Sequence, residues 1–414
     1  MIIDNQGKRS FASADVNTII ALFGAPSAKL AKNMDTVNPQ SVARFVMFRV
    51  PFDEILSPVI FEEIEAAKDR KTTQEYRLFP IDQHKLFEDG CEIPEDEEPE
   101  EITQKQKTKK SKASGPTIKI ARYIGNKWGG KYLRAPDIYW TILEKGKGKL
   151  VKLGDIAEVR RGFTTGANEF FYLDAEKIEE WSIEKEFLKS VIISPRECDS
   201  IEVIPKLLKF RVFVCNKTKK ELKFTKALEY IKWGEEQQFS QRPSCRNRLL
   251  WYSFPVKQWA KVLWPMIHNE RHCVFWNANN IAVDHNLFEI YGYNDDLLWG
   301  SLACAGQIIF RELHGRANLG QGALKTEGID IRTFVILKIE SKTIIKNIKL
   351  SRNKLSQRII EPIHEECKKA DHRELDSIIF DELSLTQGER DAVYEAVINL
   401  VEARLKKADS YKKK

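Results

Sequence analysis

A block of charge divides this chain into two parts. Nine acidic residues lie between Glu88 and Glu101, and five lysines follow between Lys105 and Lys112. A segment with few apolar residues and runs of like charge cannot build a hydrophobic core. The pattern therefore predicts a linker or insertion over about residues 88–116, with folded parts before and after it. The functional alternative is that the lysines contact DNA phosphates.

The remaining composition is that of a globular protein. Hydrophobic residues make up 42% and charged residues 31% of the 414 residues, which is enough for two or three domains with cores of their own. No run of about 18 apolar residues is present, and the first residues lack the apolar stretch of a secretory signal. We therefore expect a cytoplasmic protein without a membrane partner. The net charge of +7 permits a polyanionic partner.

The cysteines are odd in number and lie far apart. None of them forms a C-x-x-C pair, so the pattern predicts free thiols in a reducing compartment. It argues against both a disulfide framework and a cysteine zinc site. The seven are Cys91, Cys198, Cys215, Cys245, Cys273, Cys304 and Cys367.

Two strands are predicted before the charged block. Residues 16–23, VNTIIALF, form a continuous β-branched and apolar run, which is typical of a strand buried on both faces. Residues 43–50 are the second candidate. A strand buried on both faces needs neighbours on both sides, and few residues precede the first one. We therefore expect the chain to begin inside a fold.

Residues 150–340 are predicted to mix short strands with turns. Strands are expected at 153–159 and 169–173, on either side of RRGFTTGAN, where Gly162 and Gly166 permit a tight reversal. The segment 250–276 is dense in aromatic residues. We expect most of them in the core, because buried aromatic side chains dominate packing. One or two are candidates for exposed stacking surfaces.

The C-terminal part is predicted to be helical. Thr386 and Glu389 have the spacing of a capping box. The apolar residues that then recur on one helix face are Val393, Val397, Leu400, Val401 and Leu405. We expect this helix to dock against the rest of the protein.

The stretch GRANLGQGALK, residues 315–325, combines three glycines with polar donors. Glycine allows a positive φ and a close approach of the backbone, so such a loop can lie against a phosphate or a base edge. Arginine and asparagine are suited to bidentate reading of guanine and adenine. The alternative is a glycine-rich surface turn whose charges are solvated. Residue types alone leave the two interpretations equal.

Four segments are informative when they are taken together. They are LGDIAEVRRGFTTGANEFFYL at 153–173, RPSCRNRLLWY at 242–252, FRELHGRANLGQGALK at 310–325 and RELDSIIFDELSLTQGERDAVYEAV at 373–397. In this order they resemble the C-terminal half of adenine-specific N6 DNA methyltransferases of restriction–modification systems, of the type IIG, Eco57I-like kind. Relatives of this kind include enzymes that fuse a methylase to an endonuclease.

The resemblance implies a mixed α+β fold. It places a truncated remnant of the α/β, Rossmann-like methyltransferase domain at 1–135, with the charged linker inside it. A DNA target recognition domain of α+β type follows at 136–340, and helices at 341–414 complete the chain. In this family the N-terminal half carries catalysis and the C-terminal half recognises the target.

The N-terminus is similar to a late segment of the family's catalytic domain. In RSFASADVNTIIALF, residues 9–23, Phe11 occupies the place of an aromatic residue that contacts the extruded adenine. An enzyme that modifies a stacked base must flip it out and hold it on an aromatic face. The alternative is that Phe11 is a core residue beside a strand.

Motifs for catalysis are absent from the sequence. Adenine methylation in this family uses an (Asn/Asp/Ser)-Pro-Pro-(Tyr/Phe) loop, and the chain contains no Pro-Pro; its nearest match is NPQS at 38–41. No glycine-rich turn follows an early strand, as a nucleotide-like cofactor requires, and Gly129 and Gly130 resemble the bridge into the recognition domain. We therefore expect no catalytic residue and no cofactor in this chain. The complete enzyme requires S-adenosylmethionine.

Double-stranded DNA is the partner that the resemblance implies. Phosphate contacts would position the duplex while a few Arg, Asn or Gln side chains read bases. The candidates lie in the first glycine-containing turn, in the cluster Arg242, Arg246 and Arg248, and in the 315–325 loop. The residues we predict to contact DNA are Arg160, Arg161, Thr164, Thr165, Asn168, Arg246, Arg316, Asn318, Gln321 and Lys325.

Two other constellations carry less weight. His268 and His272 have a spacing that could hold a metal on one helix face, with Cys273 and His285 near them. The glutamate of an H-E-x-x-H motif is missing, so structural histidines are the better interpretation. Asp284-His285-Asn286 resembles a nuclease triad, but tripeptides recur by chance. We predict neither a metal site nor a nuclease.

Three hypotheses about function follow. The leading one is the DNA recognition portion of an N6-adenine methyltransferase, which depends on a catalytic half or subunit for methyl transfer. The second is a stand-alone specificity or scaffold subunit that works with a separate catalytic partner. The third is a degenerate protein with neither function. The target sequence, the oligomeric state and an associated nuclease do not follow from the sequence.

Overall fold

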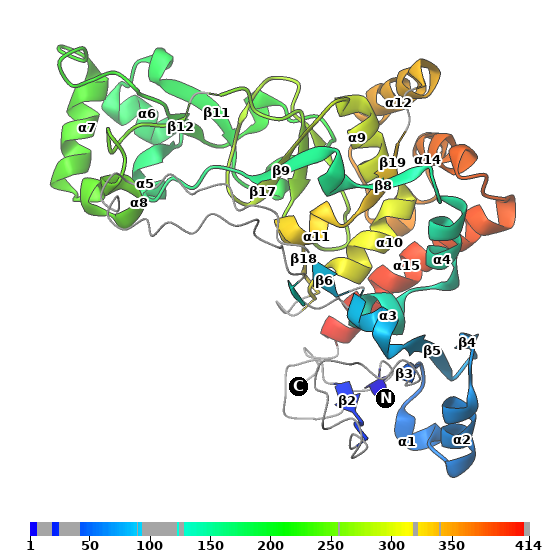
Figure 1. Ribbon diagram of the computed structural model, residues 1–414. Helices are drawn as coiled ribbons and strands as arrows, with labels where there is room; N and C mark the ends of the chain where they lie inside the picture. Colours follow the sequence, from blue (N-terminus) through cyan, green and yellow to red (C-terminus); the bar gives the residue numbers. More distant parts are fainter. Residues whose placement is uncertain are drawn as a thin grey trace, which may run out of the picture. The chain divides into compact units, whose positions relative to one another are not determined.

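The computed structural model describes residues 1–5, 19–24, 42–88, 90–92, 122–123, 128–255, 257–317, 322–338 and 341–409. They belong to two compact units, Met1–Ala135 and Pro136–Lys414, and each unit is taken by itself below. Helices and strands occur in both (Figure 1), so the predicted mixture of helix and sheet is confirmed. Within the described ranges, no helix is both long enough and apolar enough to cross a membrane.

A five-stranded sheet with the order β2-β1-β3-β5-β4 forms the first unit. Its strands are β1 (Ile2–Asn5), β2 (Ile19–Ala21), β3 (Val42–Phe48), β4 (Lys71–Thr72) and β5 (Tyr76–Asp82). β1 and β3 run parallel, and the other neighbouring pairs are antiparallel. The remaining elements are α1 (Phe52–Ile55), α2 (Pro58–Ala66), α3 (Gln83–Glu88), the paired β6 (Cys91–Glu92) and β7 (Arg122–Tyr123), and a π-helical segment at Gly129–Arg134.

Both faces of this sheet carry apolar contacts. On one face Val46 and Phe48 pack in a cluster with Ile64 of α2. On the other face the ring of Tyr132 lies 5.0 Å from Phe45 and 4.9 Å from Phe79, measured between centroids. This alternation follows from the two-residue repeat of a strand, and β3 confirms the strand predicted at 43–50.

The strand predicted at 16–23 differs from the expectation. The structure describes only its last part, as β2, and that part is not buried on both faces. Ile19 is 58% exposed and Phe23 is 86% exposed. Among the described strands, β2 stands first in the order of the sheet and pairs with β1.

The second unit contains two four-stranded sheets. One has the order β15-β13-β17-β9, and the other has the order β10-β12-β11-β16. The strands of the first are β9 (Ala157–Arg161), β13 (Val262–Pro265), β15 (Phe275–Trp276) and β17 (Leu287–Gly292). The strands of the second are β10 (Tyr172–Leu173), β11 (Leu188–Ile192), β12 (Arg211–Phe213) and β16 (Ala282–Val283). Two short pairs, β8 (Leu150–Lys152) with β19 (Val335–Leu337) and β14 (Ile267–His268) with β18 (Leu324–Lys325), complete the strands.

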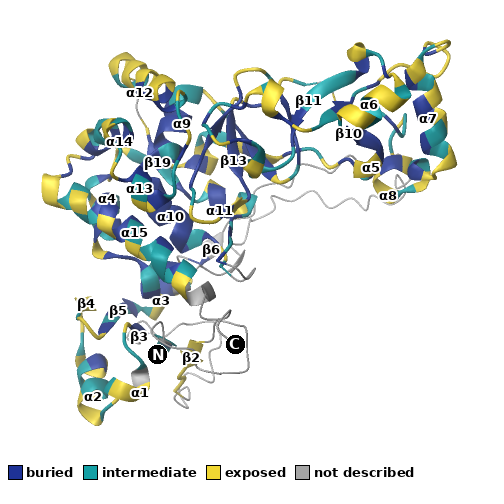
Figure 2. Ribbon diagram, turned by 180° about the vertical axis from the view of Figure 1, so that it is seen from behind, coloured by how far each residue is buried: buried dark blue, intermediate teal, exposed yellow. Residues whose placement is uncertain are grey.

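The helices of this unit gather at its two ends (Figures 1 and 2). One group surrounds β10–β12 and consists of α5 (Asn168–Phe171), α6 (Ala175–Trp181), α7 (Lys226–Glu236) and α8 (Pro243–Arg246). The other consists of α4 (Asp137–Lys145), α9 (Asp295–Ala303), α10 (Ala305–His314), α12 (Lys342–Leu355), α13 (Ile363–Glu366), α14 (Ala370–Glu382) and α15 (Gln387–Asp409). The short α11 (Gly328–Arg332) follows β18.

Several expectations for this unit are confirmed. Most aromatic residues of 250–276 are buried; Trp259 and Trp264 are 1% and 0% exposed. The capping box also forms, because the Thr386 amide donates to Glu389 Oε2 at 2.7 Å and the Glu389 amide to Thr386 Oγ1 at 3.4 Å. α15 then packs its apolar face against α10 and α4. Six cysteines, all except Cys91, are described as free and buried.

The two strands predicted around the first turn are shifted. Leu153–Asp155 forms a helical turn, and the strand β9 begins only at Ala157. Residues 168–171 form helix α5 where a strand was expected, and β10 has two residues. The neighbouring Phe170 and Phe171 are both fully buried, which a helical turn achieves inside the aromatic core but an alternating strand does not.

Candidate functional site

The turn after β9 is held against Asp284. The Phe163 amide donates to the Val283 carbonyl at 2.8 Å, and the His285 amide donates to the Phe163 carbonyl at 3.2 Å. A Cβ at Gly162 would lie 2.2 Å from the carbonyl oxygen of Asp284. Glycine is therefore required here by close backbone approach, and the turn has a fixed position on the second sheet.

Two of the predicted groups of residues meet at this turn. Arg248 donates to the Thr164 carbonyl at 3.1 Å and to the Thr165 carbonyl at 2.7 Å, and its guanidinium also lies over the rings of Phe163 and Phe171. Burial lowers the pKa of Arg248 from its ordinary value. Arg242 instead forms a bidentate ion pair with Glu169, at 2.7 and 3.2 Å. Both arginines thus brace the turn from the α8 segment.

The side chains of the turn differ in what they present to solvent. Thr165 is 1% exposed, and its hydroxyl accepts a hydrogen bond from the Ala167 amide at 3.2 Å and bonds to Asn168. Thr165 therefore stabilises the turn, and it does not belong to the exposed surface where DNA contacts were predicted. Thr164, Asn168 and Arg246 are exposed.

Arg160 and Arg161 lie on opposite faces of β9. Residue 160 pairs with Glu289 and residue 161 with Phe288, so alternation separates their side chains. Arg160 forms an ion pair with Glu158 and lies 5.3 Å over the ring of Tyr291. Arg161 donates to the His285 carbonyl at 2.9 Å. The two therefore do not act as one basic pair.

The 315–325 segment begins and ends at the two-stranded ribbon β14-β18, to which Arg316 is joined by a single bridge. β18 pairs with β14, where Lys325 lies opposite Ile267. On its other side Lys325 pairs with Arg316; the Arg316 amide donates to the Lys325 carbonyl at 2.7 Å, and the reverse bond is 2.9 Å. Residues directly opposite one another project to the same face. Ile267, Lys325 and Arg316 thus form one outward row, which we call the ribbon row.

The ribbon row is accessible from solvent. Arg316 is exposed, and Ile267 is 44% exposed. Lys325 is half-buried, and its Nζ lies 2.5 Å from Glu327 Oε1. Within the described part of the chain, Arg316 makes no ion pair. Asn318, Gln321 and Phe11, three of the predicted contact residues, lie outside the described residues.

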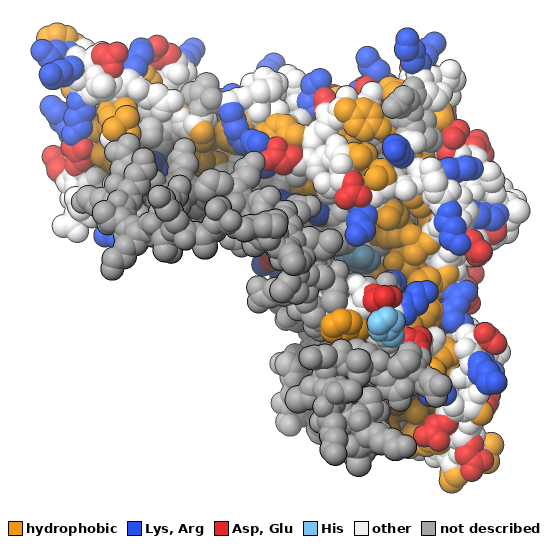
Figure 3. All heavy atoms as spheres, in the orientation of Figure 1, with side chains coloured by type: hydrophobic (Ala, Val, Ile, Leu, Met, Phe, Trp, Pro, Cys, Tyr) orange, Lys and Arg blue, Asp and Glu red, His pale blue; other side chains and the backbone are white. Residues whose placement is uncertain are grey.

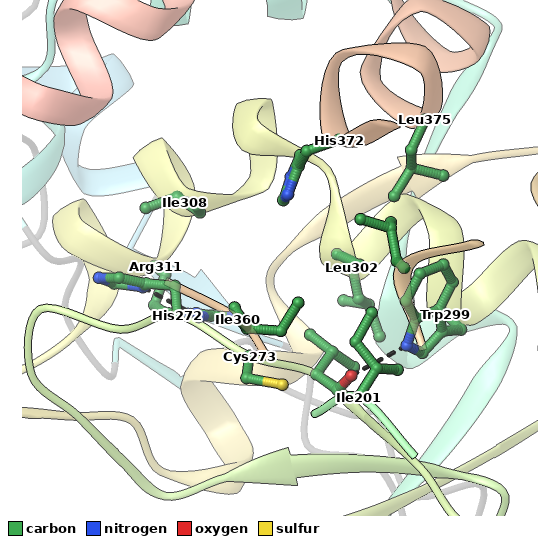
Figure 4. A pocket seen from close by; sticks show the side chains of 13 residues that line it. Ile201, His272, Cys273, Trp299, Leu302, Ile308, Arg311, Ile360, His372 and Leu375 are labelled. Atoms are coloured by element: carbon green, nitrogen blue, oxygen red, sulfur yellow. Dashed lines mark hydrogen bonds between the residues drawn. The ribbon is translucent and has the colours of Figure 1, made fainter. Parts of the chain in front are cut away.

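A buried polar cluster lies behind the ribbon and was not predicted from the sequence. It consists of His268, His272, Arg311, Glu312 and Arg404, each at most 7% exposed. Arg311 Nη1 lies 2.9 Å from His272 Nδ1, and its guanidinium lies 3.8 Å over the ring of Trp264. Figure 4 shows Arg311 and His272 side by side in the wall of a pocket that is otherwise mostly apolar.

Burial controls the protonation of this cluster. Burial lowers the pKa of His272 to about 4 and that of His268 well below its ordinary value, so both rings are neutral near pH 7. Burial opposes the ionisation of Glu312, but hydrogen bonds from His272 and Arg404 outweigh it and hold the pKa at about 2. The rings of His268 and His272 stack in the core with their centroids 5.4 Å apart.

Asp284, His285 and Asn286 form a structural junction. Tyr172 donates to Asp284 Oδ2 at 2.5 Å, the Asn286 amide donates to Oδ1 at 2.9 Å, and His285 Nδ1 lies 3.0 Å from Oδ2. Asp284 is fully buried, so its oxygens are used within the fold. Over the residues that the structure describes, no group of three His, Cys, Asp or Glu side chains could hold a metal ion.

Charged side chains of both signs are mixed on one face of the Pro136–Lys414 unit. On the face of the Pro136–Lys414 unit seen in Figure 3, lysine and arginine side chains are spread among acidic ones. The ribbon row and the first turn are distinguished by backbone geometry and by braced side chains.

Replacing Gly162 with alanine should lower the free energy of unfolding by about 1–3 kcal/mol or more. The new methyl group meets backbone atoms of Asp284 and Val283, which cannot rotate away. Chemical denaturation measures the change. Gly388→Ala is the matched control, since a Cβ there meets nothing within 4 Å. Equal stability of the two variants would contradict the assigned geometry.

Comparison with known proteins adds a second line of argument. A family model described as the C-terminal domain of the type II methyltransferase M.Eco57I matches residues 125–372. The type II methyltransferase M.AccI of Acinetobacter calcoaceticus is 26% identical over 191 residues, which are 39% of this chain and 34% of that protein. The chain thus matches about a third of the length of this relative.

Two solved structures are also similar. The type IIG restriction endonuclease BpuSI has 11% identity and a TM-score of 0.49, over 89% of this chain and 40% of that one. The type IIL restriction-modification enzyme MmeI, solved in complex with DNA, has 13% identity and a TM-score of 0.42, over 61% and 36%.

Proposed function

The chain belongs to the family of the M.Eco57I C-terminal domain and is related to restriction–modification methyltransferases, and from that premise we propose that it recognises a specific DNA sequence. In this proposal it is the recognition portion of a site-specific N6-adenine DNA methyltransferase. The methyl group comes from S-adenosylmethionine through a catalytic half or subunit that works with this chain.

The ribbon row is the observation that carries the proposal. It presents Arg316 and Lys325 outward from a backbone that is hydrogen-bonded on both sides. An arginine whose backbone is hydrogen-bonded to a neighbouring strand is suited to bidentate contact with a guanine edge, and a lysine beside it is suited to a phosphate. Rigid placement matters because a freely rotating arginine gives affinity without discrimination.

The braced first turn supplies a second proposed contact. Thr164, Asn168 and Arg246 are exposed around a backbone that Arg248 fixes. Exposed hydroxyl, amide and guanidinium groups on one turn match the donors that contact DNA phosphates. We also propose that Arg161, beside this turn, contacts DNA. Arg160 can contact DNA only when its ion pair with Glu158 is broken.

The described residues do not fit S-adenosylmethionine. Gly129 and Gly130, the one Gly-Gly pair in the sequence, lie in the π-helical segment at Gly129–Arg134 and not in a turn after a strand. The sequence also has no Pro-Pro for the loop that receives the adenine amino group. In this proposal, methyl transfer therefore belongs to the catalytic half.

The test is selection from a pool of duplexes with a randomised core, followed by binding measurements on the enriched sequence. The proposal expects enrichment of one sequence and an affinity that falls steeply with salt, because phosphate contacts release counterions. A chain that binds no duplex at low salt would sink the proposal.

Arg316→Ala should lose discrimination at one base position by about 1–3 kcal/mol if Arg316 reads a base. Affinity for the enriched duplex and for single-base variants is measured by fluorescence anisotropy. Arg390→Ala, on α15 and paired with Asp381 at 2.5 Å, is the control and should leave the profile unchanged. An equal loss for every sequence would identify Arg316 as a phosphate contact instead.

A further inference from the structure

Arg404 joins the ends of the ribbon strands to the rest of the fold. Its Nη2 donates to the carbonyl of Asn269 at 2.7 Å, and its Nη1 donates to the carbonyl of Gly322. Asn269 follows β14 directly, and Gly322 precedes β18. Because the two strands are antiparallel, these carbonyls belong to the same end of the ribbon. One guanidinium therefore spans both strands where their own pairing stops.

The guanidinium of Arg404 is also bound by a carboxylate. Glu312 of α10 accepts hydrogen bonds from Arg404 Nε at 2.9 Å and from Nη2 at 2.8 Å. Glu312 is 2% and Arg404 7% exposed, so water does not compete for these bonds. The planar fork of arginine can satisfy a carboxylate and two carbonyls at once, which the single nitrogen of lysine cannot do.

The α10 helix connects Glu312 to Arg316, which forms the single bridge to β18. It ends at His314, two residues before Arg316. Gly322 has φ of +72°, a left-handed conformation that favours glycine, and its carbonyl accepts a hydrogen bond from Arg404. Arg404 thus contacts the chain directly after β14 and shortly before β18, and it is linked to the segment of Arg316 through Glu312 on α10.

We propose that Arg404 is a positioning residue for sequence discrimination, acting through the ribbon row without touching DNA. The inference rests on the proposed function. It also concerns a residue outside the family match, because the family model matches residues 125–372 and Arg404 lies after them. In this proposal, α15 positions the residues that read the target sequence.

The experiment compares variants of the full chain. Glu312→Leu combined with Arg404→Met removes the clamp and leaves neither member of the Glu312–Arg404 pair buried alone; circular dichroism checks that the variant folds. Arg404→Lys keeps the charge beside Glu312 but only one donor nitrogen. Arg390→Met on the same helix is the control. Hydrogen exchange of the Leu324 and Lys325 amides measures the ribbon, and binding to the enriched and to scrambled duplexes measures discrimination.

We expect faster exchange in the double variant and a fall of about tenfold in the affinity ratio between enriched and scrambled duplex. Affinity for the scrambled duplex and its salt dependence should stay unchanged. Arg404→Lys should be intermediate, and Arg390→Met should match the wild type. An unchanged ratio in the double variant would overturn the inference and leave the proposed function standing. A wild-type chain that prefers no duplex would overturn both.

Discussion

Replacing Glu312 with alanine should lower the free energy of unfolding by about 3–5 kcal/mol, the loss expected when one partner of a buried ion pair is removed. Glu312 is the acceptor for Arg404, and its Oε1 lies 3.4 Å from His272 Nε2. Without this carboxylate, the Arg404 guanidinium stays buried without its anion, and Arg311 remains charged in the same interior. Urea denaturation followed by circular dichroism gives the change.

Two comparisons isolate the buried ion pair as the cause. Glu312→Leu with Arg404→Met should restore part of the lost stability, since apolar replacements of a buried pair are often close to neutral, while Arg311 still lacks the neighbouring carboxylate. Asp381→Ala breaks the partly exposed pair with Arg390 and should cost about 1 kcal/mol or less. If Glu312→Ala is as stable as Asp381→Ala, the cluster does not hold the fold as described.

Acidification should lower the stability of the fold through the same cluster. His272 has a folded pKa of about 4 against an ordinary value of 6.5. Between these values the unfolded chain binds more protons than the folded one, so the free energy of unfolding falls as the pH is lowered. The shift corresponds to about 3 kcal/mol. Glu312, with a pKa of about 2, adds a further loss as the pH falls below 4.5.

His372 changes the stability with pH in the opposite direction to His272. The test therefore compares the wild type with variants of single histidines. Burial opposes its protonation, but Asp376 and Glu366 outweigh that effect and raise the pKa of His372. Its stabilisation is therefore present in acid and is lost as the pH rises through its folded pKa. His272→Gln should show a shallower decline between pH 6.5 and 4 than the wild type. His364→Gln, at an exposed residue, is the control, and equal slopes in all three proteins would contradict the assignment.

The features that could be predicted from the sequence are local in the chain. The cap of α15 depends on residues three apart, and its apolar face repeats within a few turns. β3 and the aromatic core also follow from composition within a short window. Each of these features is determined by residues that are close together in the chain, so a sequence pattern can predict it.

The remaining features depend on partners that are far apart in the chain. Arg404 and Glu312 are separated by 92 positions, so nothing near either residue indicates the pair. The spacing of His268 and His272 suggested one helix face, but His268 lies on β14 and His272 in the loop after it. The exposure of β2 and the opposite directions of Arg160 and Arg161 likewise depend on which strands become neighbours.

The hydrogen bonds between Arg316 and Lys325 have a consequence for how such a protein can diversify. They bring the two ends of residues 317–324 together. When the ends of a segment are already joined, added length costs little free energy, because the entropy of loop closure grows only with the logarithm of the length. Gly322, whose carbonyl accepts from Arg404, and Leu324 of β18 are the residues of this segment that the framework uses. We therefore expect insertions between Arg316 and Gly322 to be tolerated, because the hydrogen bonds between Arg316 and Lys325 hold the ends of the segment together.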